Sequence, residues 1–180
     1  MSAHFLLQQL IAYEQRIRCW YQTLETRTAM PTKVRAFWRF MADDRSQCIA
    51  LLEESEECLD LIESLPEVLD PVFVNVESQV ATAEAALQRV DLSVEEALSY
   101  TVNIESCALN SLVHLWLHSF SQVAESLWLD LEHAHHERFR RLVEVVATFS
   151  NDPLLHSQAV ATWNALQSPA KVRVAVHLKT

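Results

Sequence analysis

Apolar residues recur at three- and four-residue steps in four long segments of the chain, the spacing that places side chains on one face of an α-helix. These segments cover about residues 3–27, 32–56, 93–121 and 122–149. At a rise of about 1.5 Å per residue, helices of this size reach 30 Å or more, the scale of a four-helix bundle. The pattern therefore predicts an all-α bundle, with residues 1–150 as its domain.

The connection between the second and third segments is unusually long. It covers residues 57–92, is broken by Pro66 and Pro71, and contains a predicted short helix at about 76–90. Ser93, with Glu96 three residues later, forms a capping box that predicts the start of the third helix. A connection of this length is able to cross from one end of a bundle to the other, which indicates a long crossover between the second and third helices.

Residues 151–180 follow the predicted bundle and change in pattern. A short helix is predicted at about 154–167, after the break at Asn151-Asp152-Pro153. In the tail that follows, Val172, Val174, Val176 and Leu178 alternate with other residues, a period of two that is typical of a strand. Since no other strand is evident, we expect this tail to pack on, or exchange with, a second subunit, which predicts a homodimer.

Four acidic residues interrupt the apolar stripes of the four predicted helices. They are Glu14, Asp44, Glu105 and Glu132, one in the middle of each stripe. Thirty residues separate the first two and 27 separate the last two, so the layout indicates a duplicated helical hairpin. The positions predict that all four carboxylates point into the core.

Burying carboxylates requires a source of neutralising charge. One unpaired ionised group in a dry interior costs several kcal/mol, and two such groups approach the net stability of a domain. Protonation, buried arginine or divalent cations can each supply the balance, and two divalent cations match four carboxylates. A metal-free core held by salt bridges is the alternative, and the arginines close to the acids in sequence are Arg16, Arg18, Arg45 and Arg138.

The spacing of ligand-type residues favours the metal interpretation. Glu132-x-x-His135 places an oxygen and an imidazole nitrogen one turn apart on one helical face, as in bundles that chelate metal in their core. Asp44-x-x-Gln47 has the same spacing with weaker donors. Each hairpin is thus expected to supply half of a metal site.

These positions resemble the ferritin-like superfamily, and within it the rubrerythrin-like branch, whose members carry Glu, Glu-x-x-His, Glu, Glu-x-x-His on four helices around two irons. The likeness covers about residues 3–148. Besides the candidate ligands it includes these segments: Ile11 to Glu14 followed by Tyr21; Trp38, Met41 and Ala42 before Asp44; and Leu129 to Glu132 before His135. The resemblance implies a ferritin-like four-helix bundle.

The resemblance also implies roles for the acids. Glu14 would be a terminal ligand of one metal, Glu105 and His135 would be terminal ligands of the other, and Asp44 and Glu132 would bridge the two. The hydroxyl of Tyr21 would hydrogen-bond a ligand carboxylate.

This chain departs from the family pattern in its first hairpin. Asp44 is one methylene shorter than glutamate, and Gln47 offers a carbonyl oxygen where the family has an imidazole. The expected cofactor is iron, as two ions or as one ion with the first position weak or empty, and manganese or zinc also suits these ligands.

The implied activity is that of a non-haem diiron, mixed or mononuclear carboxylate oxidoreductase that reacts with oxygen or peroxide. Rubrerythrins carry a cysteine-rich iron module that this chain lacks, so a separate electron-donor protein would be required. The alternative is a catalytically inactive ferritin-like scaffold that acts as a binding or structural protein. Asp44 and Gln47, the departures from the family pattern, favour that alternative.

Composition narrows the remaining classes of function. The chain has no glycine, which excludes phosphate-binding glycine loops, the Rossmann fingerprint and the nucleophile elbow. A net charge of −10 argues against nucleic-acid and anionic-membrane partners. Four scattered cysteines without a C-x-x-C motif fit reduced thiols. Because no secretory signal or membrane span is evident either, we expect a cytoplasmic protein.

Overall fold

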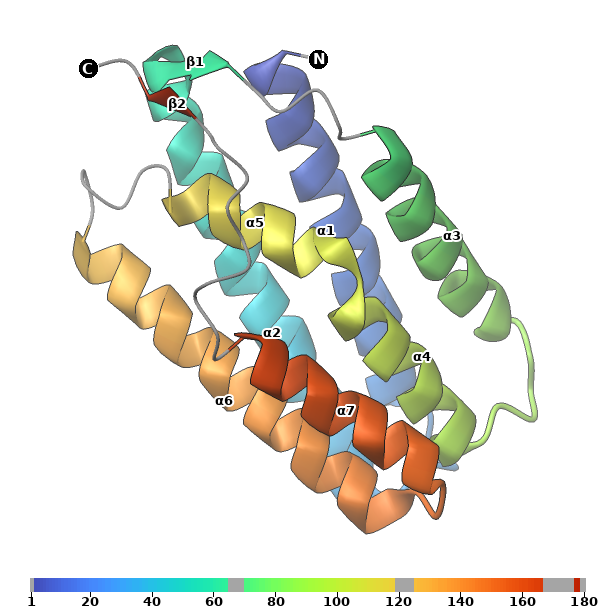
Figure 1. The fold of residues 1–180 in the computed structure, drawn as a ribbon. Helices are drawn as coiled ribbons and strands as arrows, with labels where there is room; N and C mark the ends of the chain where they lie inside the picture. Colours follow the sequence, from blue (N-terminus) through green and yellow to red (C-terminus); the bar gives the residue numbers. More distant parts are fainter. Residues whose placement is uncertain (1, 65–69, 119–124, 167–176, 179–180) are drawn as a thin grey trace.

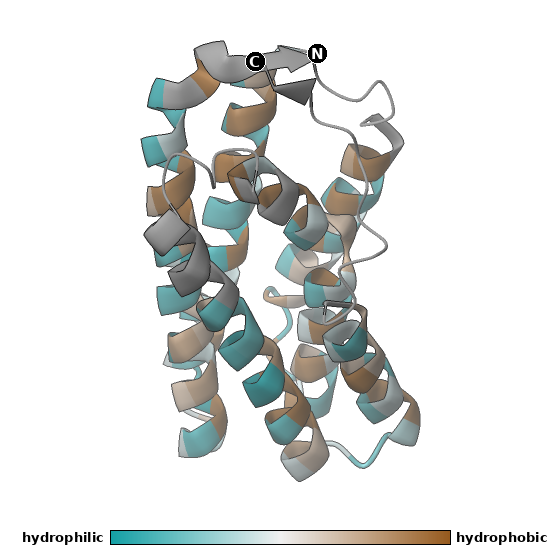
Figure 2. Cartoon of the chain, turned by 60° about the vertical axis from the view of Figure 1, so that its left-hand side comes forward, coloured by the Kyte–Doolittle hydropathy of each residue, from teal (hydrophilic) through white to brown (hydrophobic). Residues whose placement is uncertain are grey.

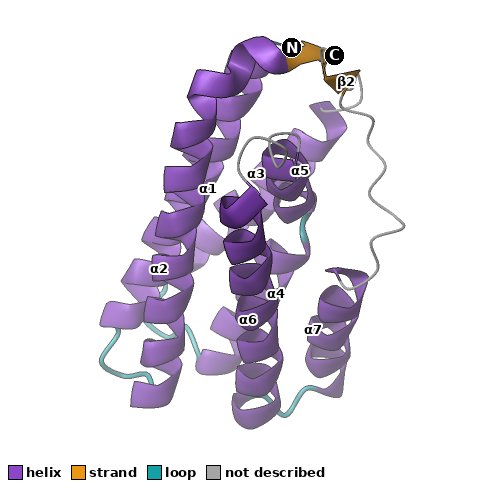
Figure 3. Ribbon diagram, turned by 90° about the vertical axis from the view of Figure 1, so that its left-hand side faces the viewer, coloured by secondary structure: helices purple, strands orange, loops and turns teal. Residues whose placement is uncertain are grey.

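The computed structural model describes residues 2–64, 70–118, 125–166 and 177–178, and most of these residues lie in helices (Figure 1, Figure 3). The side chains of residues 125–132, in the first part of the last long helix, are not among those described. The elements, in chain order, are α1 (Ala3–Thr26), α2 (Thr32–Glu54), the 3-10 helix η1 (Ser55–Leu61), β1 (Ile62–Ser64), α3 (Asp70–Ala86), α4 (Val94–Ser106), α5 (Ala108–His118), α6 (Glu125–Phe149), α7 (Pro153–Leu166) and β2 (His177–Leu178). The predicted all-helical class is confirmed.

Serine side chains cap two of the helix starts. The Phe5 amide donates to Ser2 Oγ at 3.2 Å at the start of α1. Before α4, the Glu96 amide donates to Ser93 Oγ at 3.1 Å while the Ser93 amide donates to Glu96 Oε2 at 2.9 Å, so the predicted capping box is confirmed. No described residue has a positive φ, as expected for a chain without glycine.

The helices form an elongated stack in which α1 and α2 run side by side (Figure 1). α6 lies against α2 and α4, and α3 lies against α1, α4 and α5. α7 packs on α6 and α4, so the first part of the C-terminal extension covers the body of the molecule. The predicted short helix after residue 150 is therefore confirmed, and it starts at Pro153.

The core follows the apolar stripes. Brown and teal residues alternate along the helices (Figure 2), and the side chains of Leu10, Ile17 and Leu24 on α1 are completely buried. On α6, Leu142 and Val146 are likewise fully buried. This regular spacing produces one continuous apolar core along the length of the helices.

Tryptophan side chains fix neighbouring helices to one another. Trp20 Nε1 on α1 donates to the Ala83 carbonyl on α3 at 2.9 Å. Trp38 Nε1 on α2 donates to Thr101 Oγ1 on α4 at 3.4 Å. Each indole therefore fills core volume and satisfies its single donor across a helix contact.

The third predicted helix is divided into α4 and α5, which is a correction to the expected continuous segment. α4 ends at Ser106, and the amide of Cys107, in an extended conformation, donates to the Ile104 carbonyl at 3.2 Å. Neither proline nor glycine lies at this point, so local sequence does not explain the break. Its cause is a side chain from α5, described with the site below.

The long connection and the tail also differ from expectation. α3 begins at Asp70, earlier than the predicted start near 76. β2 pairs antiparallel with β1, and Ile62 lies opposite Leu178. The tail thus has a strand partner within its own chain, which the sequence did not reveal. Residues 167–176, most of the predicted strand, lie outside the described residues.

Within the described ranges, we find no helix that has both the length and the apolar character of a membrane span.

Candidate functional site

Three of the four predicted acids lie in the core together with two arginines. The exposed fractions are 0% for Glu14, 6% for Asp44 and 1% for Glu105. Arg45 on α2 and Arg138 on α6 are 1% and 0% exposed. The prediction that these three acidic side chains point inward is therefore confirmed, and five ionisable groups share one buried region.

Arg45 joins carboxylates from two different helices. Its Nη1 donates to Glu14 Oε1 and Oε2 on α1 at 2.7 and 2.8 Å. Its Nη2 donates to Glu105 Oε1 on α4 at 2.5 Å. The guanidinium of Arg45 therefore lies between Glu14 and Glu105 and satisfies oxygens of both.

Arg138 makes the corresponding link on the other side of Glu105. Its Nη1 donates to Asp44 Oδ2 on α2 at 2.6 Å. Its Nε lies 3.3 Å from Glu105 Oε2. Glu105 is thus shared by both arginines, and each arginine connects it to one further carboxylate.

Asn110, near the start of α5, completes the network and explains the helix break. Its Oδ1 accepts from Arg45 Nη1 and from Arg138 Nη2, both at 3.1 Å. Its Nδ2 donates to the Glu105 backbone carbonyl at 2.7 Å. A side-chain amide thus occupies a carbonyl that the helical ladder normally uses, and insertion of this kind interrupts a helix. The break and the charged network are therefore one structural feature.

Tyr21 donates its hydroxyl to Glu105 Oε1 at 2.6 Å. Tyr21 is fully buried on α1, two turns after Glu14. The expected hydrogen bond from Tyr21 to a carboxylate of the site is present, and its acceptor is the carboxylate that both arginines contact. Burial, followed by the charge of Glu105, raises the pKa of Tyr21 well above its ordinary value, so the hydroxyl keeps its proton and remains a donor.

The two glutamates respond differently to this environment. Burial raises the pKa of Glu14, and the opposing charges of Arg45 and Arg138 do not fully offset it. Burial acts in the same direction on Glu105, but Arg45, Arg138 and the Tyr21 hydroxyl outweigh it, so the pKa of Glu105 lies below its ordinary value. Glu105 is therefore the firmly ionised centre of the network, and Glu14 is its more readily protonated member.

The described side chains of the network do not balance in charge. Among the side chains that the structure describes, three carboxylates face two guanidinium groups, which leaves one negative charge before any contribution from His135. Burial, with Glu14 as the main charged neighbour, also raises the pKa of Cys48, and the pKa of Cys107 rises to about 11, so both buried cysteines are neutral thiols.

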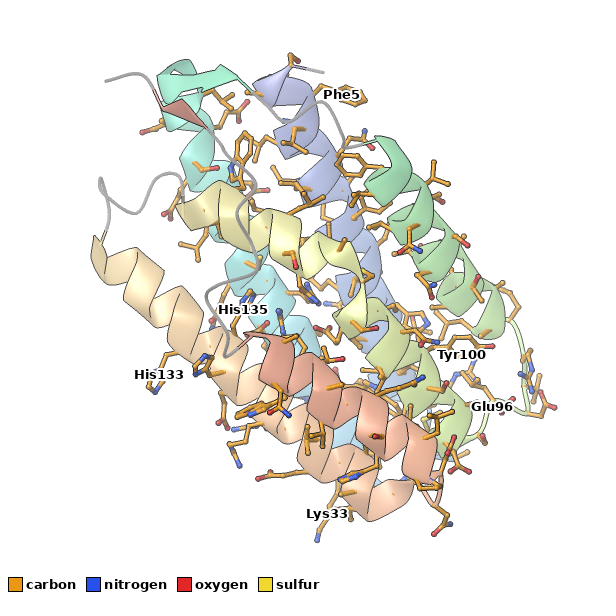
Figure 4. The ribbon with its side chains drawn as sticks, viewed as in Figure 1. Phe5, Lys33, Glu96, Tyr100, His133 and His135 are labelled. Carbon is orange, nitrogen blue, oxygen red and sulfur yellow. The ribbon has the colours of Figure 1, made fainter. Side chains whose placement is uncertain are left out.

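The remaining predicted ligands are Gln47, Glu132 and His135, and the structure describes two of their side chains. Gln47 is exposed, because it lies on the outer side of α2, which corrects its expected position beside Asp44 in the core. Glu132 belongs to α6, and its side chain lies outside the described residues. His135 is buried on the inner side of α6, whereas His133 lies on the outer side and is exposed (Figure 4).

The arrangement of these side chains does not fit a pair of metal ions. The carboxylate oxygens that would face the ions instead accept hydrogen bonds from guanidinium groups at 2.5 to 2.8 Å. A divalent cation at the same place would be repelled by two permanent positive charges. Within the described side chains, no three of the histidines, cysteines, aspartates and glutamates are grouped so as to hold a metal ion.

The sequence allows Arg45 and Arg138 as partners of the acids but does not select them over metal ions. It gives no indication of the role of Asn110. The positions of the two arginines in the helical repeat do indicate that they are buried. Arg45 lies four residues after Met41 and three before Cys48, and Arg138 lies three after His135 and four before Leu142, so both follow the buried stripes. Asn110 had no comparable signal, because its role depends on the helix break that it helps to cause.

Comparisons with protein-family models, with curated proteins and with solved structures find no match to this chain. Family membership therefore stays a resemblance in the pattern of four helices.

Proposed function

We propose that this chain is a ferritin-like four-helix bundle that has replaced metal chemistry with an arginine–carboxylate core and acts as a binding or structural protein. In this proposal α1, α2, α4 with α5, and α6 are the four bundle helices, and α3 lies in the long crossover. The side-by-side course of α1 and α2, the contacts of α6 with α2 and α4, and the placement of α3 beside α1 support it (Figure 1). α7 and the tail form the C-terminal extension.

One observation carries the functional part of the proposal. The guanidinium of Arg45 lies between Glu14 and Glu105, within 2.7 and 2.5 Å of their oxygens. Oxygens held in this way are not free to coordinate iron, and the network excludes the open coordination position that an oxidant requires. A core of this kind specifies how the helices pack against one another.

A diiron, mixed or mononuclear oxidoreductase remains the competing proposal, since Glu14, Asp44 and Glu105 do converge and Tyr21 does bind Glu105. That activity requires the two arginines to leave the space between the carboxylates. It also requires Glu132 and His135 to supply ligands from α6, and an electron-donor protein. The two proposals make opposite predictions about the purified protein.

Metal content and peroxide reactivity decide between them. The protein is expressed with added iron, manganese and zinc, purified without chelators, and analysed by inductively coupled plasma mass spectrometry. We expect well under one equivalent of each metal and an absorption spectrum that peroxide does not change. One or two equivalents of bound metal, with an absorption band that peroxide bleaches or shifts, would reject our proposal and support the oxidoreductase.

A substitution shows whether any bound metal lies in the core or at the surface. Glu105→Gln removes the central carboxylate charge, and Glu95→Gln, at the exposed start of α4, is the matched control. If metal is bound in the core, Glu105→Gln loses it and Glu95→Gln retains it. If traces of metal are bound only at the surface, Glu105→Gln leaves the metal content unchanged.

A further inference from the structure

The buried network has the connectivity of a two-cation centre. Arg45 links Glu14 on α1 to Glu105 on α4, and Arg138 links Asp44 on α2 to the same Glu105. One carboxylate is therefore shared by two positive groups, and each group holds one further carboxylate from a different helix. Divalent cations in a carboxylate-bridged bundle core have the same relation to their ligands.

We propose that Arg45 and Arg138 stand in for two cations, so that removing either guanidinium converts this core into a divalent-cation site. The inference rests on the proposed function, because it requires the natural chain to be metal-free. It goes beyond that function by assigning a latent binding site, with Glu14, Glu105 and Asn110 as the oxygen ligands at the Arg45 position. At the Arg138 position, the ligands are Asp44, Glu105 and Asn110.

The geometry around Arg45 supplies a preformed set of oxygens. Its Nη1 lies 2.7 and 2.8 Å from the two oxygens of Glu14 and 3.1 Å from Asn110 Oδ1. Divalent metal–oxygen bonds are about 2.0 to 2.2 Å long. The Glu14 and Asn110 oxygens therefore need to close in by about 0.5 to 1 Å once the guanidinium is gone. Glu105 Oε1, which accepts from Nη2 at 2.5 Å, needs to shift toward the same point.

The net charge of the buried network favours replacement of a guanidinium group by a divalent cation. In the described part of the network, three carboxylates and two guanidinium groups sum to −1. Replacing Arg45 by alanine changes this sum to −2, which one divalent cation neutralises. Leaving the two charges uncompensated in the core is strongly unfavourable, so binding of the cation and stability of the fold are coupled.

The test uses the full chain with Arg45→Ala and Co²⁺, whose visible absorption reports on its ligands. We expect Arg45→Ala to bind about one equivalent of Co²⁺. Its melting temperature should rise by about 5 to 10 °C when free Co²⁺ is 100 times its Kd. The natural chain, which keeps both guanidinium groups, should show neither effect.

Two further measurements assign the binding to the core. Glu105→Gln introduced into Arg45→Ala should abolish the Co²⁺ absorption, whereas Glu95→Gln should leave it intact. Low, non-denaturing concentrations of guanidinium ion should also stabilise Arg45→Ala, because the ion refills the vacated position. Stabilisation by guanidinium without any response to Co²⁺ would overturn the proposal, since the charged cavity would then be present and unable to hold a metal.

Loss of folding in the variant is itself informative. If Arg45→Ala is unfolded alone, recovery of its helical circular dichroism on addition of Co²⁺ supports the proposal. Arg138→Ala is the second variant, and absence of a Co²⁺ effect in both variants overturns it. Metal bound in the purified natural chain would instead reject the proposed function, so the two failures are distinguishable.

Discussion

Two arginine networks in this molecule have similar bond lengths and opposite surroundings. On the outside, Arg16 of α1 contacts Glu77 and Glu84 of α3 at 2.6 and 2.7 Å, with 32% of its side chain exposed. In the core, Arg45 contacts Glu14 and Glu105 at 2.7 and 2.5 Å, with 1% of its side chain exposed. Each arginine joins two carboxylates.

The comparison indicates that burial, and not bond geometry, determines how much an ion pair contributes to the free energy of unfolding. At the surface, water solvates either partner when the other is removed, so such pairs contribute about 0 to 1 kcal/mol. In the core, removing one partner leaves the other charge without solvent, which costs about 3 to 5 kcal/mol. The inner network is therefore less tolerant of substitution than the outer one.

Glu105→Gln should give the largest effect. Tyr21 and Arg45 approach Glu105 Oε1, while Arg138 and Asn110 approach Oε2, so either orientation of a glutamine amide places its NH₂ group against donors. We expect a loss of about 3 to 5 kcal/mol in the free energy of unfolding, measured with urea. Glu84→Gln at the outer network is the control and should lose at most about 1 kcal/mol. Equal losses in the two variants would contradict the comparison.

Asn110→Ala should give the next largest effect. It removes an acceptor that both arginines use and a donor to the Glu105 carbonyl. Buried hydrogen bonds to charged groups contribute about 1.5 to 3 kcal/mol, so we expect a loss of about 2 to 3 kcal/mol. Asn103→Ala, on a partly exposed position of α4, is the matched control.

The pH dependence of stability should separate Glu14 from Glu105. Because the pKa of Glu14 is raised in the fold, its contribution to stability is present below its unfolded pKa and is lost as pH rises through the folded pKa. Glu14→Gln imitates the protonated form at every pH. The stability of Glu14→Gln relative to the natural chain should therefore rise with pH, by at most about 1.4 kcal/mol per unit.

The corresponding result for Glu105 has the opposite sign. Its pKa is lowered in the fold, so its contribution is present above the unfolded pKa and is lost as pH falls through the folded pKa. The penalty of Glu105→Gln should therefore shrink in acid. Urea unfolding at a series of pH values measures both trends, and a common sign for the two variants would show that the two glutamates are not differentiated by their surroundings.

Arg16→Ala should give the smallest effect. The variant breaks both ion pairs that Arg16 makes with α3, yet we expect a loss of only about 0.2 to 1 kcal/mol. The loss should shrink further at about 1 M salt, where screening acts over about 3 Å. A loss as large as that of Glu105→Gln, or one that salt does not change, would mean that the outer network is protected from solvent.

The helices and the inward acids were accessible from sequence because both follow local periodicity. Leu10, Glu14 and Ile17 lie on one face of any helix with 3.6 residues per turn, whatever surrounds it. The groups that neutralise the buried carboxylates could not be identified from sequence, because charge counting alone allows either cations or arginines. Arg45 and Arg138 decide the matter in the structure, because their long side chains reach the carboxylates of other helices.

Features that depend on tertiary contacts could not be predicted. The break after Ser106 has no proline or glycine to mark it, because its cause is Asn110 binding to the Glu105 carbonyl. The partner of β2 is only three residues long, too short to give a periodic signal. The spacing from Asp44 predicts an inward position for Gln47, but a three-residue step also permits a position on the edge of a stripe.

Glu105 also fixes the alignment of the helices along their common axis. It touches side chains from α1, α2 and α6 at once through Tyr21, Arg45 and Arg138. Sliding any one of those helices by a single turn, about 5.4 Å, would separate its polar group from this carboxylate and leave it among aliphatic side chains. Apolar stripes tolerate such a shift far more readily, so the charged centre selects one register out of several that the hydrophobic pattern alone would permit.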